Sequence, residues 1–64
     1  MNADDLKEEY RDLRARIEAV DQLLDSARSS GMVQQDRTLL YTQLDAMESY
    51  GRTLKQRIGR AEME

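Results

Sequence analysis

The five residues Ser29-Ser30-Gly31-Met32-Val33 (SSGMV) separate two long segments whose apolar residues recur at alternating intervals of four and three. Gly31 suits the left-handed conformation that ends many helices, because glycine has no Cβ atom. Alternating intervals of four and three are typical of a helix that packs along a second helix. The two apolar rows are Leu6, Tyr10, Leu13, Ile17, Val20, Leu24 and Ala27, and then Leu40, Leu44, Met47, Gly51, Leu54, Ile58 and Ala61. The pattern therefore predicts two helices that fold back on each other at Gly31.

The predicted fold class is all-α. We expect a coiled-coil-like antiparallel two-helix hairpin that assembles as a homodimeric four-helix bundle. A single hairpin would span residues 1–64, with a first helix over about 3–29, a turn over 30–33 and a second helix over about 34–61. Asn2 is the expected N-cap of the first helix, because its side chain can accept a hydrogen bond from a free backbone N–H.

The register of the hairpin follows from the two rows. Facing residues in an antiparallel pair have numbers with a constant sum, and sums of 60 and 61 match the rows from end to end. This register sets Tyr10, the largest residue of its row, against Gly51, the smallest of the other. A glycine within a helix costs ~1 kcal/mol relative to alanine, and room for the Tyr10 ring is a sufficient reason for it. The register also places the acidic start of the first helix beside the basic end of the second.

The composition restricts the chemistry of the chain. Its 64 residues include no cysteine and no histidine, which excludes disulfides and typical zinc sites and removes the commonest catalytic nucleophiles and bases. We therefore expect a protein that is not an enzyme and that needs no metal or cofactor. The net charge of −3 argues against general nucleic-acid binding. Since neither a membrane span nor a signal peptide is visible, a cytoplasmic protein is expected.

A second apolar stripe predicts self-association. The core of so short a chain supplies only ~3–5 kcal/mol, and there is no disulfide or metal to add to it. An exposed stripe of this kind marks an interface, and a two-fold dimer would cover it. The predicted interface residues are Ala15, Ala19, Leu23, Leu39, Gln43, Ala46 and Tyr50. The alternative is that the stripe meets a different protein.

Arg37 falls on the apolar row of the second helix, opposite Leu24. One interpretation is structural: the stem lies along the hairpin and the head reaches Asp21, Asp25 or solvent. The other is functional: the guanidinium captures an anion together with the free backbone N–H groups that begin the second helix. The candidate ligand-binding residues are Arg37, Tyr41, Arg52 and Arg57.

Residues 39–58 contain the pattern Leu39-Leu40-x-x-Gln43-Leu44-x-Ala46-Met47-x-x-Tyr50-x-x-x-Leu54-x-x-Arg57-Ile58. This pattern resembles small helical-hairpin proteins encoded by phages and prophages. The resemblance implies a phage accessory protein that binds a host component, which includes defence systems and their signalling nucleotides. In architecture alone, the chain is also similar to the plasmid repressor-of-primer protein, a hairpin dimer that binds paired RNA loops.

Three functional hypotheses remain open at this point. The preferred one is a homo-oligomeric interaction protein that inhibits or modulates a host component in the host cytoplasm by occupying its surface. The first alternative is a sponge that binds a small phosphorylated or cyclic-nucleotide ligand between protomers, where two copies would place Arg37, Tyr41 and Gln43 around one cleft. The second alternative is an RNA-binding helical bundle.

Overall fold

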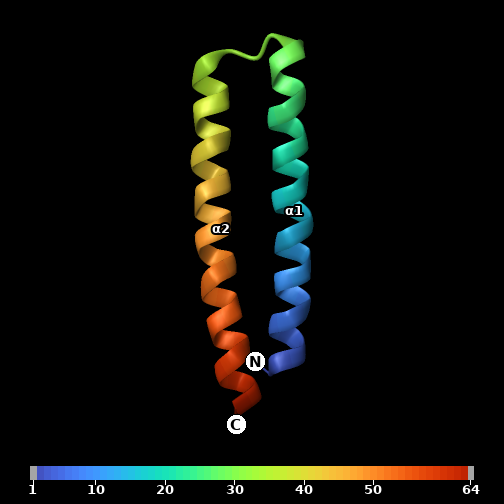
Figure 1. Cartoon of the computed structure of the whole chain (residues 1–64), viewed down its shortest axis with the longest axis vertical. Helices are drawn as coiled ribbons and strands as arrows, with labels where there is room; N and C mark the ends of the chain where they lie inside the picture. Colours follow the sequence, from blue (N-terminus) through green and yellow to red (C-terminus); the bar gives the residue numbers. More distant parts are fainter. Residues whose placement is uncertain (1, 64) are drawn as a thin grey trace.

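The chain forms an antiparallel hairpin of two long helices (Figure 1). The computed structural model describes residues 2–63 and all of their side chains except those of residues 28 and 29. Helix α1 spans Ala3–Ser30 and helix α2 spans Gln34–Met63, so both extend slightly past the expected ends at 29 and 61. The described residues contain no strand, and the all-α hairpin is confirmed. The molecule measures 49 × 15 × 13 Å.

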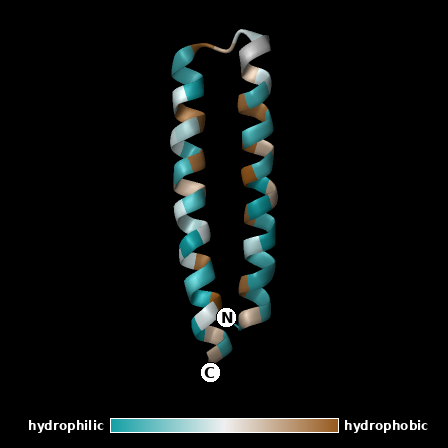
Figure 2. Cartoon of the chain, viewed as in Figure 1, coloured by the Kyte–Doolittle hydropathy of each residue, from teal (hydrophilic) through white to brown (hydrophobic). Residues whose placement is uncertain are grey.

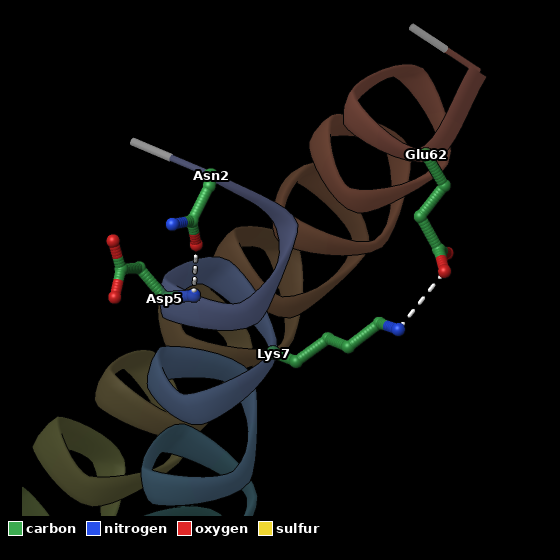
Figure 3. Close-up of polar contacts among 4 residues, drawn as sticks. All are labelled: Asn2, Asp5, Lys7 and Glu62. Atoms are coloured by element: carbon green, nitrogen blue, oxygen red, sulfur yellow. Dashed lines mark hydrogen bonds and ion pairs between the residues drawn. The ribbon is translucent and has the colours of Figure 1, made fainter.

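Local signals fix the ends of α1. The Asn2 side chain accepts a hydrogen bond from the Asp5 backbone N–H at 2.9 Å, as an N-cap should (Figure 3). Gly31 ends the helix with φ 75° and ψ 23°, the left-handed conformation expected for it. After the connection Gly31–Val33, the Val33 carbonyl accepts hydrogen bonds from the backbone N–H groups of Asp36 and Arg37 and begins α2. The chain therefore reverses within three residues.

The core lies between the facing sides of the helices, where Figure 2 shows the hydrophobic residues. All residues of the α1 row are buried except Tyr10, which is half-buried. On α2, Gly51 and Leu54 are buried, whereas the rest of the row is only half-buried. Burying a leucine or isoleucine side chain stabilises the fold by ~1.5–3 kcal/mol, so this row is the main source of stability. Apolar surface nevertheless remains exposed along α2.

The register gives the hairpin two distinct side faces. Successive residues point about 100° apart around a helix, so the residues before and after a core residue lie on opposite sides. Tyr50 and Glu9 each precede a core residue, and the Tyr50 hydroxyl donates a hydrogen bond to the Glu9 carboxylate. Lys7 and Glu62 each follow a core residue, and they form an ion pair with 2.9 Å between Nζ and Oε2 (Figure 3). We call the first side the stripe face and the second the charged face.

The ion pair at the open end differs from the expected arrangement. The sequence predicted acidic residues of α1 beside basic residues of α2, whereas here Lys7 of α1 is the cation and Glu62 of α2 is the anion. The hydrogen bond from Lys7 to Glu62 and the charge of Glu62 raise the pKa of Lys7 above its ordinary value. Both side chains are about half exposed, so the pair orients the helix ends more than it stabilises them.

Replacing Gly31 by alanine is expected to lower the free energy of unfolding by ~1–2 kcal/mol, because a Cβ atom makes the left-handed conformation unfavourable. A Cβ there would meet no atom within 4 Å, so the loss comes from the backbone alone. Urea denaturation at one protein concentration, followed by circular dichroism, measures the change. Asparagine tolerates this conformation better, so Gly31→Asn should lose less. An alanine variant as stable as the parent would contradict the proposed cause.

Candidate functional site

The predicted interface residues are all exposed in the single hairpin. The large ones are Leu39, Leu23 and Tyr50, with 67, 45 and 42 % of their surface accessible. Six of the seven directly precede a core residue and therefore share the stripe face. The exception is Ala15, which lies two residues before Ile17 and is turned toward the outer side of α1. The structure thus groups most of the predicted stripe on one continuous face that spans both helices.

Polar groups accompany this apolar surface. The Tyr50 hydroxyl is bonded to Glu9, which holds the ring across the gap between the helices. The Gln43 amide lies 3.9 Å from the Met47 sulfur, which is a weak acceptor, so the amide retains most of its capacity for hydrogen bonds. The stripe therefore offers an ordered aromatic ring and an available amide to whatever covers it.

The charged face carries two hollows. The first, which we call the turn-end hollow, has a volume of about 350 Å³ and is lined by Leu24, Gln34, Arg37, Thr38 and Tyr41. Leu24 and Arg37 both line it, as expected for facing positions of the register. Tyr41 is 55 % accessible and exposes its ring at the edge. The arrangement combines a cation, an aromatic face and small polar groups in one place.

Arg37 is half-buried although it carries a charge. Within the described residues no carboxylate forms an ion pair with it, so of the partners expected in the structural interpretation, Asp21, Asp25 or solvent, only solvent remains. A guanidinium without a carboxylate partner keeps its N–H donors available for the oxygens of an anion. The structural and the functional interpretation of Arg37 therefore both stay predictions.

The second hollow, the central hollow, has a volume of about 220 Å³ and lies near the middle of the charged face. It is lined by Tyr10, Arg14, Glu48, Gly51, Arg52 and Lys55. Three of these side chains are cations and one is an anion. The Lys55 ammonium lies 5.7 Å from the centre of the Tyr10 ring, within the range of a cation–π contact. Arg52 donates a hydrogen bond to the Ser49 hydroxyl at 3.0 Å.

Gly51 forms the floor of the central hollow. A Cβ atom built on it would lie 3.5 Å from Leu13 Cδ2 and 3.7 Å from Tyr10 Cε2, so Tyr10 does face Gly51 as the register predicted. Both distances are ordinary van der Waals contacts. The Tyr10 ring therefore does not require glycine at position 51, because it leaves room for the methyl group of an alanine. Only a larger side chain would clash with the ring. The glycine keeps the hollow open without being required by the core.

The four candidate ligand-binding residues do not converge in one hairpin. Arg37 and Tyr41 share the turn-end hollow, but Arg52 lies roughly 22 Å further along α2, given 1.5 Å per residue. Arg57 precedes Ile58 and therefore lies on the stripe face. Tyr41 and Gln43 also occupy opposite faces, so a single copy does not bring them together. The structure divides the predicted set into two sites and one residue outside them.

Sequence reasoning missed Arg14, Lys55 and Tyr10 as neighbours of Arg52. Their signal was present, because Arg14 and Lys55 each directly follow a core residue, as Arg52 does. Among residues 2–63 no group of three acidic side chains is placed to hold a metal ion. No helix in the same part of the chain is long and apolar enough to cross a membrane.

Comparison with known proteins gives one match. A family model described as Sequestin matches residues 2–60, which is nearly the whole chain. No curated protein matches, and neither does any solved structure.

Replacing Gly51 by alanine is expected to raise the free energy of unfolding by up to ~1 kcal/mol, because alanine favours the helix and its methyl group fits. Gly59→Ala is the matched control, since a Cβ there meets nothing within 4 Å and only helix propensity changes. Gly51→Leu should instead cost ~1–3 kcal/mol through overpacking against Tyr10 and Leu13. Urea denaturation of the three variants measures these differences, and a stabilising leucine would refute the Tyr10–Gly51 contact.

Proposed function

This chain belongs to the Sequestin family, and we propose that it is a phage accessory protein that inhibits a host defence system by sequestering one of its components. Membership of the family supports a small binding protein rather than an enzyme. The phage origin is supported by the character of the family as small phage-type anti-defence proteins. The pattern of residues 39–58 agrees with this.

The observation that carries the proposal is Arg37 in the turn-end hollow. The residue as a whole is half-buried, and its guanidinium has no carboxylate partner among the described residues. A guanidinium presents planar pairs of N–H donors that match the oxygens of a phosphate. Tyr41 exposes a ring beside it, and Gln34 and Thr38 add side chains that can donate and accept hydrogen bonds. We infer that the sequestered component is a small phosphorylated ligand, such as a cyclic nucleotide.

The size of the hollow agrees with such a ligand. Small-molecule sites commonly measure roughly 300–1,000 Å³, and the turn-end hollow, at about 350 Å³, lies within this range. The first turn of α2 adjoins the hollow, and its backbone dipole favours a negative charge there. A planar base on Tyr41 and a phosphate on Arg37 would use both features at once.

A host protein as the sequestered component remains the second candidate, because the stripe face is apolar and exposed. It would have to compete with self-association, which we propose as the normal cover of that face in a homodimeric four-helix bundle. Once the stripe is covered, the charged face is left for binding, and its small polar hollows suit a small anion better than a protein. The net charge of −3 makes RNA the weakest of the three candidates.

Thermal unfolding with a panel of cyclic nucleotides and linear nucleoside phosphates tests the proposal. A ligand at 100 times its dissociation constant should add ~2.7 kcal/mol to the free energy of unfolding. Arg37→Gln should abolish this stabilisation, and Tyr41→Ala should weaken it. Arg60→Gln is the control, since it removes one positive charge at the far end of α2 and should leave binding unchanged.

Two results would count against the small-ligand proposal. One is a panel in which no compound stabilises the protein. The other is equal stabilisation of Arg37→Gln and the parent, which would place the ligand elsewhere on the chain. In the first case, the protein-binding candidate would take its place.

A further inference from the structure

The stripe residues of α2 repeat the spacing of the core. Leu39, Gln43, Ala46 and Tyr50 are separated by four, three and four residues, and each directly precedes a core residue. An alternating interval of this kind lines up on one side of a helix and suits a second helix packed against it. All four side chains are exposed in the single hairpin. Helix α2 therefore presents a second helix-packing seam beside the one that α1 occupies.

This seam is complementary to itself. When two identical helices pack antiparallel about a two-fold axis, the numbers of facing residues have a constant sum. Leu39 with Tyr50 and Gln43 with Ala46 share the same sum of 89. We propose that the α2 helices of two copies pack in this register, with the two-fold axis between Leu44 and Asp45. This inference rests on the self-association contained in the proposed function and specifies its geometry.

Side-chain sizes agree with the register. It sets Leu39 against the partner's Tyr50 at both ends of the seam and Gln43 against the partner's Ala46 near the axis. Leu23 of α1 lies on the same face and at the level of the start of α2, because Leu24 and Arg37 line one hollow. Leu23 thus joins Leu39 against the ring of the partner's Tyr50. Leu23, Leu39 and the partner's Tyr50 thus form one cluster, and the two-fold axis generates a second, equivalent cluster.

Charges favour the antiparallel arrangement of two copies over a parallel one. Asp36 precedes Arg37 and lies on the stripe face near the start of α2, and Arg57 lies on the same face near its end. The register sets Asp36 opposite the partner's Thr53, one helical turn from the partner's Arg57. A parallel pair would instead bring Asp36 against the partner's Asp36. The helix dipoles are also opposed when the pair is antiparallel.

The register determines how many ligand sites a dimer has. The turn-end and central hollows lie on the charged face, which points away from the paired α2 helices. Each copy would therefore carry complete hollows of its own, and no residue of the partner would line them. A dimer of this geometry binds two ligands per two chains, rather than one ligand between protomers.

Single-cysteine variants test the register directly, because the chain contains no cysteine of its own. Tagged Gln43→Cys is mixed with untagged Ala46→Cys, unfolded and refolded together, and oxidised. The mixed disulfide of two chains should be the main crosslinked product on a non-reducing gel. Leu39→Cys mixed with Tyr50→Cys should behave in the same way. Tyr41→Cys, two residues from Gln43 but on the charged face, is the matched control and should not crosslink. Light scattering of the parent protein at several concentrations is measured in parallel.

The outcomes separate the register from self-association itself. A mixed disulfide between Leu39→Cys and Gln43→Cys, in preference to Leu39→Cys and Tyr50→Cys, would show a slip of one heptad and overturn the register. Predominant Gln43→Cys homodimers would show a parallel pair and do the same. Dimers in light scattering without any of these crosslinks would place the contact on another face. A monomer at every concentration would refute self-association and the register together.

Discussion

The whole molecule depends on one contact surface, the apolar row along which α1 meets α2. Leu54, which is completely buried, belongs to its core cluster together with Leu6, Leu13 and Ile17. Since the chain has no cysteine or histidine, neither a disulfide nor a histidine-bound metal can reinforce this surface. The same row also fixes the two side faces, because its register decides which residues precede and which follow a core position. The stripe face and the charged face are consequences of that single alignment.

The separation of the two faces divides the roles of the molecule. Apolar residues that precede core positions offer surface to another helix, while cations and aromatic rings that follow core positions line the two hollows. Gly51 illustrates the division, because it opens the central hollow at the expense of helix stability although the core would accept alanine. A glycine within a helix that brings no gain in packing is typical of a functional surface. The proposed association and the proposed ligand capture thus use surfaces that do not compete.

Much of the fold was predictable from the sequence. The helix ends followed from Asn2 and Gly31, because capping is a local property, and the Tyr10–Gly51 contact followed from the spacing of two rows. The contacts of side chains beside the core row were harder to predict. The ion pair of Lys7 and Glu62 depends on long side chains with several partners in reach, which spacing alone does not rank. The four candidate ligand residues share their chemistry but not their side of α2. Tyr41 directly follows a core residue and Arg57 directly precedes one, so residue type alone does not show which of them lie together.

The three-residue connection Gly31–Val33 also sets the order of events during assembly. A short link loses little entropy when its ends close, and helical proteins dominated by contacts near in sequence fold within microseconds to milliseconds. The encounter of two chains depends on their concentration and is slower when copies are few. In the assembly that we propose, newly made chains therefore pass through a folded, solitary stage with Leu39 and Leu23 uncovered. During that interval, hetero-association competes with pairing, and the rate of synthesis becomes a determinant of which complex forms first.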